Sequence, residues 1–335
     1  MVLDNKLAVA SLSLGLHPSH TLDAKIKAAA HNHFKAIEIV YSDLEAHSTA
    51  HSLNVVDGAR QIADICAENG LEILSLCPFM DFEGYNSPLS LRLNTAQHWM
   101  EVCRALGATY FQVPSQSDDN SIGDEHVIVE ELRQLADLGA ASDEPPVYIA
   151  YEALAWGKYI NLWEESLHIV EAVNRPNFGV CLDIFHIAAK LWGDNQIPQG
   201  KLPDGEKALQ QSLDLLVKKC PLEKLYYVQL SDGELFDPPL SPEHPLWKEG
   251  EPPGLTWSLH ARPFPLETEL GGYFPVVEMT RAVLKGLGYK GYISLEVFDR
   301  RMREEANGPE HAASRGFNSW QNLIKAVKKQ DGNKL

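Results

Sequence analysis

Four short apolar segments each end in an oxygen-bearing side chain, and this pattern constrains the fold more than any other feature of the chain. They are rich in aliphatic, β-branched and aromatic residues, as parallel strands buried on both faces are. The segments are Tyr148–Glu152, Val180–Asp183, Leu225–Gln229 and Tyr292–Glu296. Because α/β barrels carry their catalytic groups at the carboxyl ends of their strands, the pattern predicts three carboxylates and one amide converging at one rim.

Strand and helix patterns alternate along the whole chain. Strands are expected at 6–13, 36–40, 72–76, 110–113, 148–151, 178–182, 225–229 and 292–295. Helices are expected near 55–69, 92–106, 128–138, 185–190, 208–218 and 314–328. Thr21 is a candidate helix cap, Asn161 with Glu164 forms a candidate capping box, and Gly139 is a candidate helix stop. Eight strand–helix units predict an α/β fold, a single-domain (β/α)8 TIM barrel over residues 1–330; an open doubly wound sheet is the alternative.

One long segment departs from this alternation. Residues 231–275 follow the seventh strand, are rich in proline and contain Trp247 and Trp257. Loops of this length in a compact domain are usually functional. Since the segment leaves from the rim, we expect it to be a lid over the site; the alternative is that it packs on a neighbouring subunit of a homo-oligomer.

The charge balance excludes several classes of partner. The formal net charge is −17, whereas binding to a nucleic-acid backbone requires a positive surface. No apolar run reaches the length of about 18 residues that indicates a membrane helix. The five cysteines have no CxxC spacing and are expected to be reduced thiols. Together with an N-terminus that lacks a signal-peptide pattern, these features predict a cytoplasmic protein acting on a small molecule.

The side chains that end the four segments form a hard, oxygen-rich ligand set. Glu152, Asp183, Gln229 and Glu296 together suit a divalent ion such as Mg²⁺ or Mn²⁺ better than an ion that prefers thiolates. Three carboxylates around one divalent ion leave a net charge near −1. The ion would therefore remain a Lewis acid with positions open to substrate oxygens.

Five further side chains are candidates for substrate binding, proton transfer or the lining of the cavity. His186 lies three residues after Asp183, where the start of a helix can turn it toward the rim. Ser258 and Arg262 lie in the long segment, and an arginine there is suited to grip a carboxylate with two parallel hydrogen bonds. Arg92, at the start of the third helix, and Glu38, at the end of the second strand, are two more side chains that we consider for the cavity; both also have ordinary structural explanations.

Three sequence motifs resemble a known group of enzymes. They are residues 151–156 (YEALAW), 174–183 (NRPNFGVCLD) and 294–302 (SLEVFDRRM). All three resemble the fungal 3-dehydroshikimate dehydratases of quinate catabolism, which are xylose-isomerase-like TIM barrels. The likeness extends over residues 11–320, and the last two motifs are the longest and most specific.

This resemblance implies a reaction and roles for the candidate residues. The expected reaction is the dehydration of 3-dehydroshikimate to protocatechuate through a metal-stabilised enolate, with one divalent ion (Mg, Mn or Co). The resemblance makes Glu152, Asp183, Gln229 and Glu296 the metal ligands. It places Ser258, Arg262 and His186 on the substrate, and we add Arg92 as a fourth candidate contact. His186 and Glu152 are the candidate proton carriers.

Other functions remain open on the same scaffold. A metal-dependent ketose isomerase or epimerase would use Glu152 and Glu296 as catalytic groups on opposite faces of its substrate. A ligand-binding regulator would have kept the barrel without its metal. A repair endonuclease would need additional histidines and a basic face, and the charge of −17 argues against one.

Overall fold

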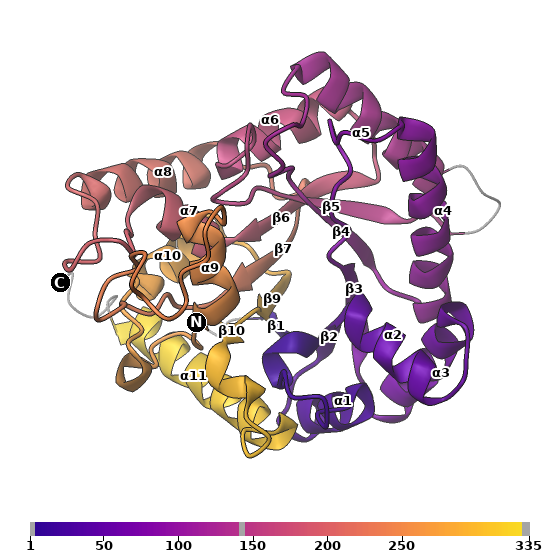
Figure 1. Ribbon diagram of the computed structural model, residues 1–335, viewed down its shortest axis with the longest axis horizontal. Helices are drawn as coiled ribbons and strands as arrows, with labels where there is room; N and C mark the ends of the chain where they lie inside the picture. Colours follow the sequence, from indigo (N-terminus) through magenta and orange to yellow (C-terminus); the bar gives the residue numbers. More distant parts are fainter. Residues whose placement is uncertain (1–3, 141–144, 330–335) are drawn as a thin grey trace.

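Eight parallel strands close into a barrel in the order β1-β2-β3-β4-β5-β6-β7-β9, and the helices surround it (Figure 1). The computed structural model describes residues 4–140 and 145–329 of the 335-residue chain. The barrel strands are β1 (Lys6–Ala10), β2 (Ala36–Val40), β3 (Glu72–Cys77), β4 (Tyr110–Pro114), β5 (Tyr148–Glu152), β6 (Phe178–Asp183), β7 (Leu225–Leu230) and β9 (Tyr292–Leu295). The predicted closed TIM barrel is therefore confirmed.

Most of the α-helices pack on the outside of the barrel, whereas α9 packs against the short strands β8 (Ala261–Arg262) and β10 (Phe298–Asp299). The α-helices are α1 (Leu22–His31), α2 (Tyr41–Ala50), α3 (Val55–Glu68), α4 (Leu89–Leu106), α5 (Glu125–Ala140), α6 (Trp163–Val173), α7 (Ile184–Leu191), α8 (Gly205–Lys219), α9 (Pro253–His260), α10 (Val276–Arg281) and α11 (Pro309–Lys329). Shorter helical segments are η1 (Ser11–Leu14), η2 (Thr268–Leu270), η3 (Ala282–Gly286) and η4 (Arg300–Arg303). One large apolar cluster joins the outer faces of the strands to these helices.

The alternation of side chains along each strand carries the candidate site residues into the barrel. Ala150, Cys181 and Tyr227 belong to a buried apolar layer formed by side chains from several strands. Because side chains two residues apart on a strand share a face, the positions two residues further on also face the interior. Those positions on β5, β6 and β7 are Glu152, Asp183 and Gln229, and the site is built directly on the apolar layer.

The segment 231–275 is not the plain loop that its proline content suggested. It contains α9, and it also contains β8 (Ala261–Arg262), which pairs antiparallel with β10 (Phe298–Asp299). Arg262 lies opposite Phe298 in this pairing. The short sheet ties the segment to the chain that follows β9, and it fixes the arginine beside the rim.

Several local predictions are corrected by the structure. The first strand ends at Ala10, and η1 follows it where the sequence predicted continued strand. Helix α5 reaches Ala140, one residue past Gly139, and residues 141–144 lie outside the described ranges, so the stop at Gly139 stays a prediction. A Cβ at Gly139 would lie 3.0 Å from the carbonyl oxygen of Val147, which explains why a glycine is needed there.

Two helix starts also differ from the sequence-based expectation. Helix α2 was not predicted, because it follows β2 without a connecting loop and has little apolar periodicity. The capping interaction of α6 is shifted by one residue. Glu165, not Glu164, accepts hydrogen bonds from the amides of Asn161 and Leu162, at 2.7 and 3.1 Å. The cap at Thr21 is confirmed, since its side chain accepts a hydrogen bond from the amide of Ala24.

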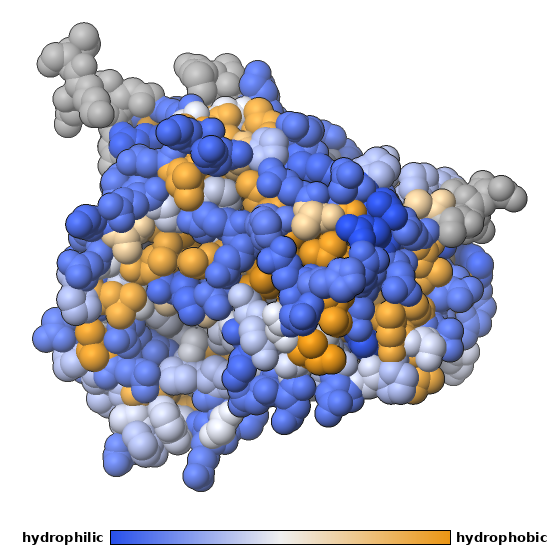
Figure 2. Space-filling model, turned by 90° about the horizontal axis from the view of Figure 1, so that it is seen from above, coloured by the Kyte–Doolittle hydropathy of each residue, from blue (hydrophilic) through white to orange (hydrophobic). Residues whose placement is uncertain are grey.

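The surface is mostly hydrophilic. Figure 2 shows separate apolar patches among hydrophilic residues on the face in view, consistent with the acidic composition. Within the two described ranges, no helix combines the length and apolar character needed to cross a membrane.

Candidate metal and substrate site

The structure brings all four predicted metal ligands together at the carboxyl ends of adjacent strands. Cys181 pairs in register with Glu152, and Asp183 pairs with Gln229. Glu296 directly follows β9, and its amide donates a hydrogen bond to the carbonyl of Leu230 on β7 at 3.1 Å. All four side chains are buried. The four side chains lie together because they come from the ends of four neighbouring strands.

Glu152 has one satisfied and one unsatisfied carboxylate oxygen. Gln112 of β4 donates a hydrogen bond to Oε2 at 2.5 Å. Oε1 is buried and accepts no hydrogen bond within the described residues. Burial, together with the charges of Glu296 and Asp183, raises the pKa of Glu152 well above its ordinary value. An orphaned buried oxygen of this kind costs free energy unless a cation or a donor is present.

Gln229 is held by carboxylates on both sides. Its amide nitrogen donates to the two oxygens of Glu38, at 3.1 and 3.2 Å, and to Oε1 of Glu296 at 3.1 Å. Its oxygen accepts a hydrogen bond from the thiol of Cys181 at 3.2 Å. Ligation of a cation through the amide oxygen therefore requires the amide group to turn over.

Glu38 adds a fourth buried carboxyl to the cluster. It lies within β2, not at its end, and its side chain is fully buried. Ser75 donates a hydrogen bond to it at 2.7 Å. Burial raises the pKa of Glu38, and burial likewise raises the pKa of Glu296 to about 8. The cluster thus concentrates more acidic groups than it can hold in ionised form without a cation.

Arg262 supplies positive charge to this cluster. Its Nη2 lies 2.6 Å from Oδ2 of Asp183, and its Nη1 lies 3.1 Å from Oε2 of Glu296. Nε donates to the hydroxyl of Ser231 at 2.8 Å, and Nη1 lies 3.5 Å from the hydroxyl of Ser258. The guanidinium is almost completely buried, although it comes from the long segment after β7. The sequence did not indicate that Arg262 would contact two of the metal ligands.

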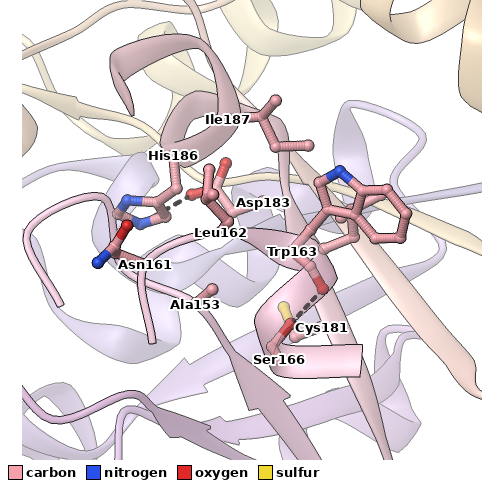
Figure 3. Close-up of a pocket in the computed structure, with 10 residues that line it drawn as sticks. Ala153, Asn161, Leu162, Trp163, Ser166, Cys181, Asp183, His186 and Ile187 are labelled. Carbon is pink, nitrogen blue, oxygen red and sulfur yellow. Dashed lines mark hydrogen bonds and ion pairs between the residues drawn. The ribbon is translucent and has the colours of Figure 1, made fainter. Parts of the chain in front are cut away.

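His186 lies between Glu152 and Asp183, at the start of α7. Figure 3 shows the imidazole facing Asp183 beside a small pocket between α6 and α7. Nε2 is 3.5 Å from Oε1 of Glu152 and 3.6 Å from Oδ2 of Asp183. The amide of Ala155 donates to Nδ1 at 3.0 Å, which assigns the proton of the neutral ring to Nε2. Burial lowers the pKa of His186 to about 4, so the ring is neutral at physiological pH.

The residues fit a divalent cation. Glu152, Asp183 and His186 each offer one ligand atom, and these three atoms lie within 4.8 Å of one another. The carboxylate oxygens of Glu152 and Asp183 suit Mg²⁺ or Mn²⁺. His186 has no free lone pair in this arrangement, because Nδ1 accepts a hydrogen bond from the amide of Ala155 and Nε2 carries the proton, so it stays a candidate for substrate binding.

Arg92 lies in a different network. Its guanidinium forms a two-point ion pair with Glu131, at 2.7 and 2.8 Å, and also donates to the carbonyls of Phe82 and Ser87. These contacts join α4 to α5 and to the loop after β3. A role of Arg92 in substrate binding remains a prediction that the present contacts do not support.

Sequence reasoning missed the polar side chains that hold the site residues in place. Gln112 on β4 bonds Glu152, and Ser231 at the end of β7 bonds Arg262. The sequence did contain a signal for Gln112, because it is a single polar residue among apolar residues in the middle of a buried strand.

Comparison with known proteins identifies the family. The model of the xylose isomerase-like TIM barrel family matches residues 26–323. The chain belongs to this family. This xylose isomerase-like barrel is 37% identical to a 3-dehydroshikimate dehydratase of Neurospora crassa, over 97% of its own length and 95% of the relative's. A 3-dehydroshikimate dehydratase of Pseudomonas aeruginosa is 31% identical over 88% of this chain. The aligned part makes up 38% of the length of that relative. The resemblance found in the three motifs is confirmed.

Solved structures share the fold. A fusion of a xylose isomerase-like TIM barrel with a 4-hydroxyphenylpyruvate dioxygenase aligns with a TM-score of 0.75 at 25% identity, covering 99% of this chain and 45% of the fusion. The IolI protein with a bound zinc atom aligns with a TM-score of 0.70 at 20% identity, covering 97% of this chain and 98% of IolI. At this level of identity the IolI structure supports the fold alone.

Proposed function

We propose that this xylose isomerase-like barrel is a 3-dehydroshikimate dehydratase that forms protocatechuate with the help of one divalent cation. The observation that carries the proposal is the full-length similarity to the Neurospora enzyme combined with a buried cluster of carboxylates beside an arginine. Glu152, Asp183, Gln229 and Glu296 are the residues available to hold the cation. When bound, it supplies positive charge that stabilises negative charge developing on substrate oxygens.

Arg262 and Ser258 would bind the substrate. The planar guanidinium suits a carboxylate, and Phe185 and Phe298 flank it, with the guanidinium carbon 4.4 and 5.3 Å from the ring centres. In the present structure the guanidinium pairs with Asp183 and Glu296. A bound cation would take over the charge of these carboxylates and release donors of Arg262 for the substrate. The segment 231–275 then acts as the lid that carries the carboxylate-binding group.

The proton transfers follow from the protonation states of the side chains. A proton leaves the carbon that bears the α-hydroxyl, the β-hydroxyl departs as water, and a final proton shift from the ring to the ketone oxygen makes the ring aromatic. Glu152 and Glu296 are the carboxylates near enough to the cluster to accept the first proton, and either can act as a base only when its oxygen is not bound to the cation. His186 carries its proton on Nε2, so we assign it as a hydrogen-bond donor to a substrate hydroxyl.

The proposal is tested by adding 3-dehydroshikimate to the purified protein with Mg²⁺, Mn²⁺ or Co²⁺. We expect the ultraviolet absorbance of an aromatic product to grow, and we expect Glu296→Gln to abolish this growth. A parallel assay with ketoses tests the alternative of an isomerase or epimerase. Turnover of a ketose without any aromatic product from 3-dehydroshikimate would overturn the proposal.

A further inference from the structure

A second group of potential ligands lies outside the barrel, where α1 meets α2. Asp23 is in the first turn of α1, and His47 and His51 are one turn apart at the end of α2. Each residue offers one ligand atom, and these atoms lie within 4.8 Å of one another. Figure 1 shows α1 and α2 side by side in the indigo part of the chain, on the outside of the barrel. The group shares no residue with the site at the strand ends.

The hydrogen bonds of the two histidines place their lone pairs toward this group. Nε2 of His47 lies 2.9 Å from the side-chain oxygen of Gln61, so in the neutral ring it carries the proton and Nδ1 carries the lone pair. Nδ1 of His51 lies 2.9 Å from the carbonyl of His47 and must donate to it, which leaves the lone pair on Nε2. In the neutral form each ring thus has one nitrogen that donates and another that carries a lone pair, and for His47 this second nitrogen lies beside Asp23.

Asp23 completes the group with an oxygen that lacks a donor. Its Oδ1 is buried and accepts no hydrogen bond within the described residues, although it lies 2.9 Å from Nδ1 of His47. Two atoms that both carry lone pairs repel each other at this distance unless a positive charge lies between them. A proton on Nδ1 can supply that charge in the ion pair of His47 with Asp23, and a bound cation would take the place of this proton. Zinc ligands stand about 2.0–2.2 Å from the ion, which puts two tetrahedral ligands roughly 3.3–3.6 Å apart, so binding requires a small separation of the two side chains.

The surroundings suit an ion that enters from solvent. The group borders a cavity of about 560 Å³, which His17 and His20 also line. His51 is exposed and His47 is buried, so the site has one open side and one fixed side. The nearby charges of Lys25 and Asp43 compensate each other in an ion pair of 2.8 Å. Gln61 and the carbonyl of His47 act as the outer hydrogen-bond partners that usually orient metal-binding histidines.

We infer that Asp23, His47 and His51 form a second metal site, for Zn²⁺ or a similar borderline divalent ion. Two imidazole nitrogens and one carboxylate oxygen are the ligand types that such ions prefer over Mg²⁺. The ion would link the start of α1 to the end of α2, with its remaining positions open to water. This site does not depend on the proposed dehydratase activity.

Zinc titration of the full-length, tag-free protein after removal of metals tests the inference. We expect wild-type protein to bind two equivalents of Zn²⁺, one at the barrel and one at the second site. His51→Ala should lower the affinity of one equivalent at least tenfold without changing dehydratase activity. His98→Ala, which removes an exposed histidine on α4, is the matched control and should bind two equivalents.

Two more variants distinguish the barrel site from the second site, and the loss of a ligand from a loss of stability. Glu296→Gln should weaken the barrel site and leave the equivalent that His51→Ala removes. Asp23→Asn should also lose that equivalent. The amide of the new side chain can donate a hydrogen bond to Nδ1 of His47, so the metal-free variant should unfold at no lower temperature than the metal-free wild type. Zinc binding that His51→Ala and Asp23→Asn leave unchanged would overturn the inference, whatever the number of equivalents that the wild type binds.

Discussion

Arg262 is the residue that would link the proposed substrate binding to the candidate metal ligands. It is buried, contacts Asp183 and Glu296, and lies between the rings of Phe185 and Phe298. In the absence of a cation its charge compensates the cluster. With a cation in place, the same guanidinium is the group best placed to meet a substrate carboxylate.

Replacement of Arg262 tests this double role. Arg262→Ala should cost about 2–5 kcal/mol of transition-state stabilisation, measured as the loss in kcat/KM for 3-dehydroshikimate. Arg262→Lys should recover only part of this loss, because an ammonium group lacks the planar fork of the guanidinium. Circular dichroism should show that both variants fold. Kinetics of Arg262→Ala within twofold of the wild type would reject the assignment.

His186 is the second residue whose role can be decided by substitution. His186→Ala should reduce turnover by roughly 10²–10⁴-fold if the ring takes part in proton transfer. Metal content should be measured in the same preparations, because Nε2 lies close to two ligands. His186→Asn keeps a hydrogen-bond donor but cannot relay a proton. Turnover near the wild-type value in this variant would mean that His186 positions the substrate and that a carboxylate is the base.

At the scale of elements, the loop after β3 is held against β5 by a buried carboxyl. Oε1 of Glu83 accepts hydrogen bonds from the amide of Gln116 at 2.7 Å and from the hydroxyl of Tyr151 at 2.9 Å. Oε2 is buried without a partner in the described part of the chain. Burial raises the pKa of Glu83 from 4.5 to about 7. The loop that leads to α4 is thus fastened beside the strand that carries Glu152.

This carboxyl should make stability depend on pH. Between pH 4.5 and 7 the folded protein keeps a proton on Glu83 that the unfolded chain releases, so folding becomes less favourable as pH rises through this window. Relative to Glu83→Gln, the wild type should lose up to about 3 kcal/mol of unfolding free energy between pH 4 and 8. Denaturant unfolding of both proteins at several pH values measures the difference. Parallel curves for the two proteins would contradict the prediction.

At the scale of the whole molecule, the core of the barrel is separate from the candidate metal site. The apolar cluster between strands and helices and the apolar layer inside the barrel do not involve the metal ligands. The fold should therefore persist without metal, while activity should not.

Metal removal tests this separation. Chelator treatment should abolish dehydratase activity, and Mg²⁺, Mn²⁺ or Co²⁺ should restore it, with little change in the circular dichroism spectrum. Glu296→Gln should bind the metal far more weakly than a variant with a surface substitution such as His98→Ala, because a charged buried ligand is lost. Full activity of a metal-free preparation would show that the cation is not required.

The sequence by itself determined the barrel and the four groups at its rim. Both depend on local periodicity: apolar runs define the strands, and alternation every second residue directs Glu152, Asp183 and Gln229 inward. The order of the strands then follows from right-handed connections between neighbours. The failure to predict α2 was also local in origin, since this helix lacks apolar periodicity.

Only the tertiary structure decided how the side chains around the ligands act. The tautomer of His186 depends on an amide 31 residues earlier, and the pairing of Arg262 depends on a carboxylate 79 residues earlier. Arg92, which the sequence made a candidate for substrate binding, instead pairs with Glu131 on another helix. Such contacts join residues far apart in the chain, and strand and helix periodicity carries no information about which distant side chains will meet.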